Sequence, residues 1–319
     1  MTVYGLKLMT ELRGPDELVR QAVAAEASGF EFVAISDHFH PWLPEHHHSP
    51  FAWAVLGAVA ATAPRLELAT GVTCPTMRYH PAVVAQAAAT VATMSDRPFT
   101  LAVGAGERLN EHVTGRPFPS VDVRHEMLEE AVDIIRTLWT GDWTTIRGRH
   151  LSVEDARLFD LPEEPPRLAV AVSGPDSLDL AARCGADGVV ATEPRADLVE
   201  GWSTRGGEAK ATWTEVPFAW APSVDEGAEL ARSRFRFGAG GWKVMSELPD
   251  PVNFDAACRT VRPEDLADPV PSGPDPEPYV RAVRAYQDAG FERIAIVPVN
   301  DDLDVLLEFW EREVLPELT

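Results

Sequence analysis

Short apolar segments alternate along the chain with longer segments of amphipathic or alanine-rich pattern. The short segments are rich in Val, Ile, Leu and Ala without strict polar alternation, which is typical of strands that are buried on both faces. The pattern predicts eight such strands, at Val3–Lys7, Phe32–Ile35, Leu66–Val72, Phe99–Val103, Leu168–Val172, Gly188–Ala191, Trp213–Ala221 and Arg293–Val297.

Most of these strands are followed by a segment with helical periodicity. Proline at the expected first turn and glycine after the expected last turn mark several ends, as Pro15 and Gly29 do for the first helix. The predicted helices are Pro15–Ser28, Phe51–Thr62, Pro81–Met94, Val123–Trp139, Asp176–Cys184, Val224–Phe235, Pro278–Ala289 and Asp302–Leu315.

Eight strands alternating with helices imply parallel pairing through right-handed crossovers. This count predicts an α/β fold, a (β/α)₈ TIM barrel formed by residues 1–319 as a single domain. The length beyond a minimal barrel lies in two insertions. Residues 142–160 are expected to form a β-hairpin and loop, and residues 238–277 an irregular excursion. A doubly wound open sheet is the alternative, weakened because no GxGxxG turn follows the first strand.

The charge balance narrows the function classes. Fifty acidic residues against 28 basic ones give a formal net charge of −22, and only three of the basic residues are lysines. A nucleic-acid binder or a protein held on anionic lipid needs a basic surface, so neither partner is expected. A small-molecule substrate remains the expected partner.

Cysteine usage and hydropathy bear on the compartment. The three cysteines, Cys74, Cys184 and Cys258, are far apart and lack CxxC spacing, so a disulfide framework is not expected. No apolar run approaches the roughly 20 residues that span a bilayer, and no signal peptide is recognisable. We therefore expect a cytoplasmic protein.

Two side chains that can transfer protons follow predicted strands. His38 comes three residues after Phe32–Ile35, and Glu107 comes four residues after Phe99–Val103. An imidazole accepts a proton near neutral pH, and a partly buried carboxyl group can act as a general acid. Taken singly, each motif is as consistent with a capped strand end or a helix start. Together they indicate an active site, because barrel enzymes place their chemistry at the carboxyl ends of strands.

Other motifs carry weaker signals. Ser173 and Gly174 precede a helix whose free N–H groups suit a phosphate, although a plain N-cap explains them equally well. The adjacent histidines 46–48 are not expected to bind a metal, because neighbours on a loop rarely converge on one ion. No GxSxG motif supports a serine hydrolase.

Four motifs resemble the luciferase-like superfamily of deazaflavin-dependent oxidoreductases. They are ISDHFHPW at residues 35–42, GVTCPTMRYHPAVVAQ at 71–86, VGAGERLNE at 103–111 and LWTG at 138–141. The chain is most similar to the subgroup typified by the F420-dependent glucose-6-phosphate dehydrogenases. The similarity covers roughly residues 4–200 and returns in the final helix–strand–helix.

This resemblance implies a barrel that holds coenzyme F420 in its mouth, usually as a homodimer. It also implies a catalytic role for His38 as base on the substrate hydroxyl, for Trp42 in steadying the reacting group and for Glu107 in exchanging a proton with the deazaflavin. A non-proline cis peptide is implied at Gly71–Val72. The implied cofactor contacts are Asp37, Gly71, Val72, Cys74, Gly106, Glu107, Asn110, Ala171, Val172, Ser173, Gly174 and Thr192.

The resemblance weakens where the sugar-phosphate enzymes hold their substrate's phosphate with lysine and arginine. Arg195 is the expected replacement for the first of these cations. The expected substrate-binding residues are therefore His38, Trp42 and Arg195. Residues 251–270 contain no lysine, and Arg259 and Arg262 are the alternative cations there. We therefore expect hydride transfer at the carbon of an alcohol or sugar hydroxyl, without a lysine-clamped phosphosugar.

Two other functions stay open at this point. An FMN-dependent monooxygenase on the same barrel would need reduced flavin and oxygen. A binding or sensory module that has lost catalysis is disfavoured because both proton-transfer candidates, His38 and Glu107, are present.

Overall fold

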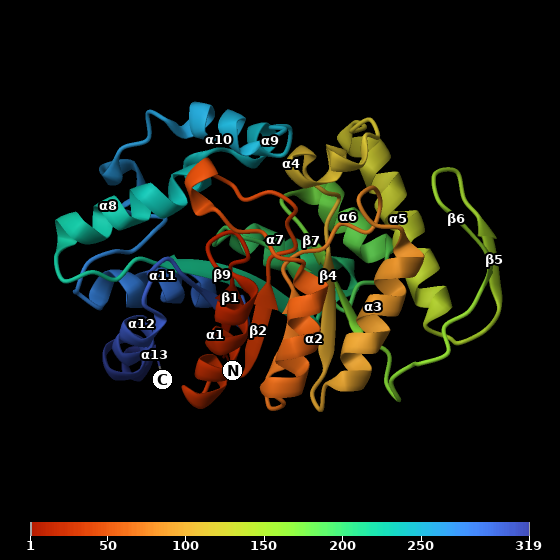
Figure 1. Ribbon diagram of the computed structural model, residues 1–319, viewed down its shortest axis with the longest axis horizontal. Coiled ribbons are helices and arrows are strands. Elements are labelled where there is room, and N and C mark those ends of the chain that lie inside the picture. The colour runs from red at the N-terminus through yellow and green to blue at the C-terminus, as the bar shows by residue number, and fades with distance from the viewer. Residues whose placement is uncertain (1, 319) are drawn as a thin grey trace.

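The computed structural model describes residues 2–318, and eight of its strands close a parallel barrel (Figure 1). The order around the barrel is β1-β10-β9-β8-β7-β4-β3-β2, with every neighbouring pair parallel. The predicted TIM barrel is therefore confirmed. The barrel strands are β1 Val3–Leu8, β2 Phe32–Ile35, β3 Glu67–Thr70, β4 Phe99–Val103, β7 Arg167–Ala171, β8 Gly188–Val190, β9 Ala211–Phe218 and β10 Arg293–Pro298.

Helices surround this barrel and connect its strands. They bury one face against the strands, which explains why the strand sequences are apolar throughout. The helices are α1 Pro15–Ala27, α2 Ala52–Thr62, α3 Pro81–Met94, α4 Arg108–Glu111, α5 Val121–Leu138, α6 Pro175–Arg183, α7 Ala196–Trp202, α8 Val224–Phe235, α9 Trp242–Met245, α10 Pro251–Cys258, α11 Glu277–Asp288, α12 Leu303–Phe309 and α13 Leu315–Leu318.

The barrel interior is filled mainly by small side chains. Phe32 and Trp213 pack edge to face there, with ring centroids 5.0 Å apart. Beside them lie alanines from five strands, Ala34 of β2, Ala69 of β3, Ala102 of β4, Ala169 of β7 and Ala295 of β10. The two large rings take up space that these small side chains leave, so the interior is a packed core.

Helix ends follow the local chemistry that the sequence indicates. Pro81 occupies the first turn of α3, and the Nδ1 atom of His80 accepts a hydrogen bond from the Ala82 N–H. Helix α1 begins at Pro15, and the chain turns at Gly29 with a φ of 81°. These local signals are why the predicted bounds of α3 match and those of α1 differ by one residue.

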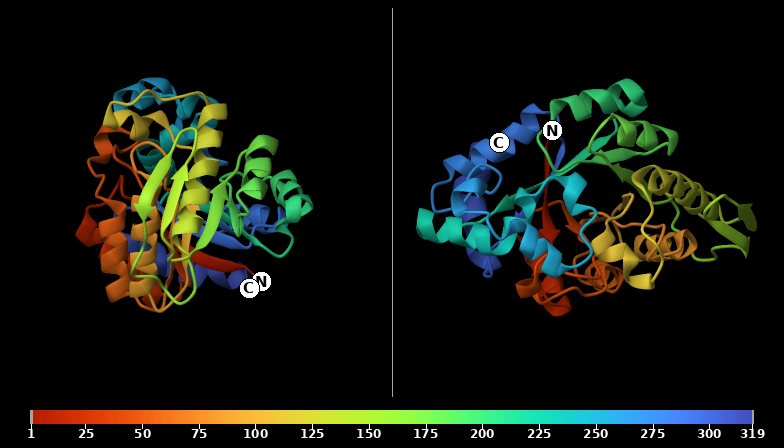
Figure 2. Two further views of the ribbon diagram at one scale, coloured as in Figure 1. Left: turned by 90° about the vertical axis from the view of Figure 1, so that its right-hand side faces the viewer. Right: turned by 90° about the horizontal axis from the view of Figure 1, so that it is seen from above.

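The first insertion lies between α5 and β7, and the second lies between α8 and α11. Residues 142–160 contain the expected hairpin, β5 Thr144–Arg147 and β6 Ser152–Ala156, which stands at one edge of the molecule (Figures 1 and 2). Residues 238–277 are more regular than predicted, because they contain α9, α10 and a short 3-10 helix. Figure 1 shows α8, α9 and α10 along the upper side of the molecule.

Three smaller differences from the prediction also matter. Strand β3 ends at Thr70, two residues before its predicted end, and the Gly71–Val72 peptide bond that comes next is cis. Helix α7 after β8 was not predicted, and the final helix is interrupted by a π-helical turn at Trp310–Val314. Within residues 2–318, no helix has the length and apolar character that crossing a bilayer requires.

Candidate active site

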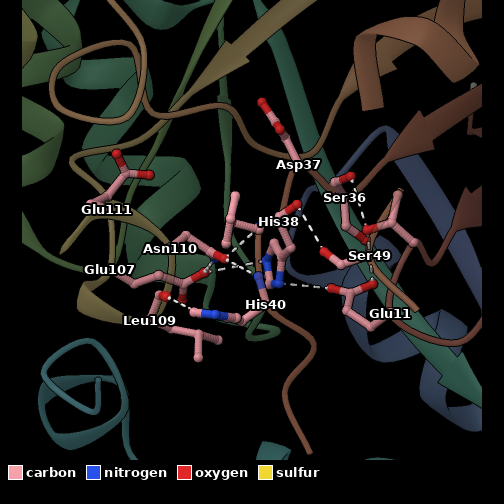
Figure 3. Close-up of polar contacts among 12 residues, drawn as sticks. Glu11, Ser36, Asp37, His38, His40, Ser49, Glu107, Leu109, Asn110 and Glu111 are labelled. Carbon is pink, nitrogen blue, oxygen red and sulfur yellow. Dashed lines mark hydrogen bonds and ion pairs between the residues drawn. The ribbon is translucent and has the colours of Figure 1, made fainter. Parts of the chain in front are cut away.

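His38 lies between two buried carboxylates at the carboxyl ends of the barrel strands (Figure 3). Its Nδ1 atom is 3.0 Å from Oε1 of Glu11, and its Nε2 atom is 3.3 Å from Oε1 of Glu107. Glu11 follows β1, His38 follows β2 and Glu107 follows β4. The three loops thus bring together a pair of residues that the sequence suggested and one that it did not.

Glu107 is held by Asn110 one turn later. The Asn110 amide nitrogen donates to Glu107 Oε1 at 2.6 Å, while its Oδ1 accepts from the N–H groups of Phe39 and His40. Those two backbone contacts fix the amide orientation, so its nitrogen must face Glu107. Asn110 therefore links the loop that carries His38 to Glu107.

Burial changes the acidity of Glu107. Its side chain is almost fully buried, and the loss of hydration raises its pKa, partly offset by the nearby His38. Within residues 2–318, its Oε2 atom has no hydrogen-bond partner. A buried acidic oxygen without a partner is suited to exchanging a proton with a bound molecule.

Trp42 forms an apolar boundary beside His38. The two rings meet edge to face with centroids 4.6 Å apart. The Trp42 ring stacks on Phe237 at 4.8 Å and meets Phe254 edge to face at 5.2 Å. Because Phe237 and Phe254 come from the segment after α8, this excursion contributes to the site.

Asp37 is engaged within the chain rather than left free. Its Oδ2 accepts from the Thr73 hydroxyl at 2.7 Å, and its Oδ1 accepts from Arg78 and from the Tyr79 hydroxyl, each at 2.9 Å. Arg78 also donates its backbone N–H to Glu111 at 2.8 Å. The cofactor contact expected for Asp37 would therefore have to share a carboxylate that already has partners on both oxygens.

The peptide bond Gly71–Val72 is cis, as the resemblance implied. The Gly71 carbonyl accepts from Lys7 Nζ at 2.6 Å. Further along this segment, the buried Cys74 lies 3.2 Å from the Thr76 hydroxyl, and burial raises the pKa of its thiol. A Cβ on Gly106 would come within 2.7 Å of the Cys74 sulfur, so these loops approach closely because residue 106 is glycine.

The expected phosphate-side residues lie together after β7 and β8. The backbone N–H groups of Ser173 and Gly174 both donate to the Ser177 hydroxyl, at 2.9 and 3.2 Å. Arg195 donates to the Ser173 carbonyl at 3.0 Å and pairs with Asp197. Ala171 and Val172 directly precede Ser173, and Thr192 lies three residues before Arg195. The N–H groups expected to be free at 173 and 174 are therefore already paired with Ser177.

The histidines at 46–48 do not form a cluster with other ligands. His46 is buried beside Phe237, its Nε2 contacts the Arg234 carbonyl, and burial lowers its pKa to about 4. No group of three or more His, Cys, Asp or Glu side chains arranged to hold a metal occurs in residues 2–318.

The profile of the family described as luciferase-like monooxygenase matches residues 2–297. The chain belongs to that family.

Among its luciferase-like relatives are two F420-dependent dehydrogenases that each align with 98% of this chain at 35% identity. One is the hydroxymycolic acid dehydrogenase of Mycobacterium tuberculosis, of which 88% is covered. The other is a glucose-6-phosphate dehydrogenase of Tsukamurella paurometabola, of which 97% is covered.

One of the solved structures has a similar fold. It is described as an F420-dependent secondary alcohol dehydrogenase in complex with an F420–acetone adduct. It superimposes with a TM-score of 0.91 at 26% identity, covering all of this chain and 99% of the other.

Several residues of the candidate site were not predicted from the sequence. Glu11 follows β1, and the rule that chemistry follows barrel strands would have singled it out had it been applied to the first strand. Arg78 and Glu111 lay inside motifs of the resemblance but carried no signal of their contact. Phe254 sits in the excursion and Phe237 directly before it, and no sequence pattern linked either one to Trp42.

Proposed function

We propose that this protein transfers hydride between coenzyme F420 and the carbon of an alcohol. The observation that carries the proposal is the placement of His38 against Glu107, with 3.3 Å between Nε2 and Oε1 at the barrel mouth. Alcohol oxidation needs a base for the hydroxyl proton and a second group that exchanges a proton with the cofactor. His38 and Glu107 supply these two groups.

The residues at the mouth fit coenzyme F420 as the cofactor. The partnerless buried Oε2 of Glu107 offers a proton-exchanging atom. When bound, the deazaflavin supplies a carbon that accepts or returns hydride and a ring nitrogen that gains or loses a proton. The residues proposed to hold it are Asp37, Gly71, Val72, Cys74, Gly106, Glu107, Asn110, Ala171, Val172, Ser173, Gly174 and Thr192.

Glu11 contributes to the reaction by setting which nitrogen of His38 carries the proton. The carboxylate of Glu11 lies 3.0 Å from Nδ1 and, although the two groups are not aligned as a hydrogen bond, its negative charge favours the tautomer that carries its proton on Nδ1. That tautomer leaves the Nε2 lone pair as the base for the substrate hydroxyl. Trp42 covers the edge of the imidazole and excludes water from that side.

The apolar wall beside Trp42 favours an uncharged alcohol over a phosphosugar. Phe254 and Cys258 are buried on α10, whereas Arg259 is mostly exposed and pairs with Asp255. Arg262 is likewise exposed and pairs with acidic neighbours. The structure named for a secondary alcohol supports this substrate class, and the relative named for hydroxymycolic acid supports an alcohol without a phosphate, whereas other relatives are named for glucose 6-phosphate.

Three measurements test the proposal. Tryptophan fluorescence during titration with coenzyme F420 and, separately, with FMN measures both affinities. Loss of F420 absorbance with 2-propanol, longer secondary alcohols and glucose 6-phosphate measures the substrate class. His38→Ala should abolish alcohol oxidation while keeping F420 affinity. Tight FMN binding without a response to F420, or unchanged turnover of His38→Ala, would contradict the proposal.

The proposal extends to assembly and location. We expect a cytoplasmic homodimer, supported by the family resemblance. Light scattering coupled to size-exclusion chromatography measures the mass in solution, and a monomer at every concentration would contradict the dimer.

A further inference from the structure

Arg78 contacts two of the loops that surround the site. Its Nη2 atom donates to both the Asp37 carbonyl, at 2.6 Å, and the Asp37 carboxylate, at 2.9 Å. Its backbone N–H donates to Glu111 at 2.8 Å, and its Nε lies 3.8 Å from the same carboxylate. A single residue in the loop after β3 therefore holds both the loop after β2 and the helix after β4.

Each of these contacts lies close in sequence to a proton-transfer residue. Asp37 directly precedes His38. Glu111 lies one turn after Glu107, and its N–H donates to the Glu107 carbonyl at 3.1 Å. A shift of Arg78 would therefore be passed to His38 through one peptide unit and to Glu107 through one turn of α4.

Electrostatics make this arrangement dependent on the guanidinium. The side chains of Asp37 and Glu111 are 1% and 2% exposed, and that of Arg78 is 7% exposed. Removing one partner of a buried pair leaves an uncompensated charge, which the loops would relieve by moving apart or admitting water. Tyr79 adds a further link, because its hydroxyl accepts from Arg78 and donates to Asp37.

We infer that Arg78 is a positioning residue that sets the distance between His38 and Glu107. This inference rests on the proposed function, in which those two residues transfer protons. It assigns to Arg78 no contact with substrate or cofactor. Its role is to act through Asp37 on one residue and through Glu111 on the other.

Arg78→Met tests this role, with Arg293→Met as the matched control. Arg293 also forms a partly buried pair, with Glu67 at 2.8 Å, but both residues begin their strands at the opposite end of the barrel. In Arg78→Met we expect kcat with coenzyme F420 and 2-propanol to fall by ~10–100-fold, the loss typical of a misplaced catalytic group. The KM for the alcohol should change little, and Arg293→Met should retain wild-type kcat.

The imidazole NMR signal of His38, assigned by its loss in His38→Ala, gives a readout that needs no cofactor. It should shift or broaden in Arg78→Met and stay unchanged in Arg293→Met. Arg78→Lys, which keeps the charge, should recover part of kcat and of the signal, and it replaces Arg78→Met if that variant does not fold. A folded Arg78→Met with wild-type kcat and an unchanged signal would overturn the inference, as would an equal loss of kcat in Arg293→Met.

The two proposals fail in distinguishable ways. A wild-type protein that does not respond to coenzyme F420 contradicts the proposed function, while the NMR comparison still measures whether Arg78 positions His38. If Arg78→Lys is the only variant that folds, wild-type kcat together with an unchanged His38 signal overturns the role of Arg78.

Discussion

The Nε2 atom of His38 and the Oε1 atom of Glu107 lie 3.3 Å apart, so the two residues proposed to transfer protons are in direct contact. From the sequence they were expected only to follow two different strands of the barrel. Charges on groups this close interact strongly, so substituting either residue changes the electrostatic surroundings of the other. The base and the acid of the proposed reaction are therefore electrostatically coupled before any substrate binds.

Glu107→Gln tests the acid. The amide keeps the shape and an oxygen for Asn110 but cannot exchange a proton, so kcat should fall by ~10²–10⁴-fold. Fluorescence titration should give an affinity for coenzyme F420 close to that of the wild-type protein. If turnover stays at the wild-type level, Glu107 is not the acid.

Glu11→Gln tests the carboxylate behind His38. The substitution keeps the volume of a fully buried side chain but removes the charge that favours the Nδ1-protonated tautomer. We expect kcat to fall at least about 10-fold, within the range of general acid–base contributions. Steady-state kinetics with coenzyme F420 and 2-propanol provide the measurement. Wild-type kcat would assign Glu11 a purely structural role.

Glu111→Gln tests a pH-dependent contribution to stability. Burial raises the pKa of Glu111 from 4.5 to about 7, with Arg78 opposing the shift. The folded protein therefore binds this proton more tightly than the unfolded chain, so the contribution is fully present below pH 4.5. It is lost as the pH rises through about 7. This loss is of the order of 3 kcal/mol, at about 1.4 kcal/mol for each pKa unit.

The measurement is urea denaturation of both proteins across that pH range. Glutamine keeps an oxygen for the Arg78 N–H and does not titrate. The unfolding free energy of the wild-type protein should therefore decline with pH more steeply than that of the variant. Parallel pH profiles would show that Glu111 does not titrate in this window.

Phe254→Ala tests the apolar wall beside Trp42. Loss of a fully buried phenylalanine should destabilise the protein by ~3–5 kcal/mol. It should also raise the KM for small secondary alcohols more than for longer ones, because the enlarged space suits a bulkier chain. Val252→Ala, at an exposed position of the same helix, is the control. Equal changes in KM for short and long alcohols would exclude Phe254 from substrate selection.

The barrel itself was predictable because its signals are local. Pro81 and the alanine-rich pattern that follows give the bounds of α3, and the compact apolar runs give β2 and β4 without error. Helix α7 was missed because Ala196–Trp202 is short and mixes acidic residues and glycine with its apolar positions. Helix α10 was missed because the proline and acidic residues of its segment resemble those of a loop.

The site was predictable only in part, because its contacts join distant parts of the chain. Strand-end position was sufficient to select His38 and Glu107. It does not indicate that Arg78 bonds to Asp37, 41 positions away, or that Trp42 stacks on Phe237. Such pairs depend on how the loops close over the barrel, which no periodicity in the sequence records.

The stacking of Trp42 on Phe237 brings together two parts of the chain that lie far apart in sequence. The proposed proton-transfer groups come from loops after β1 and beyond, whereas the wall proposed to face the alcohol comes from the segment after α8. On the proposed function, substitutions in that segment would change the choice of substrate without touching His38 or Glu107. A barrel divided in this way can acquire a new substrate while its proton-transfer residues stay in place.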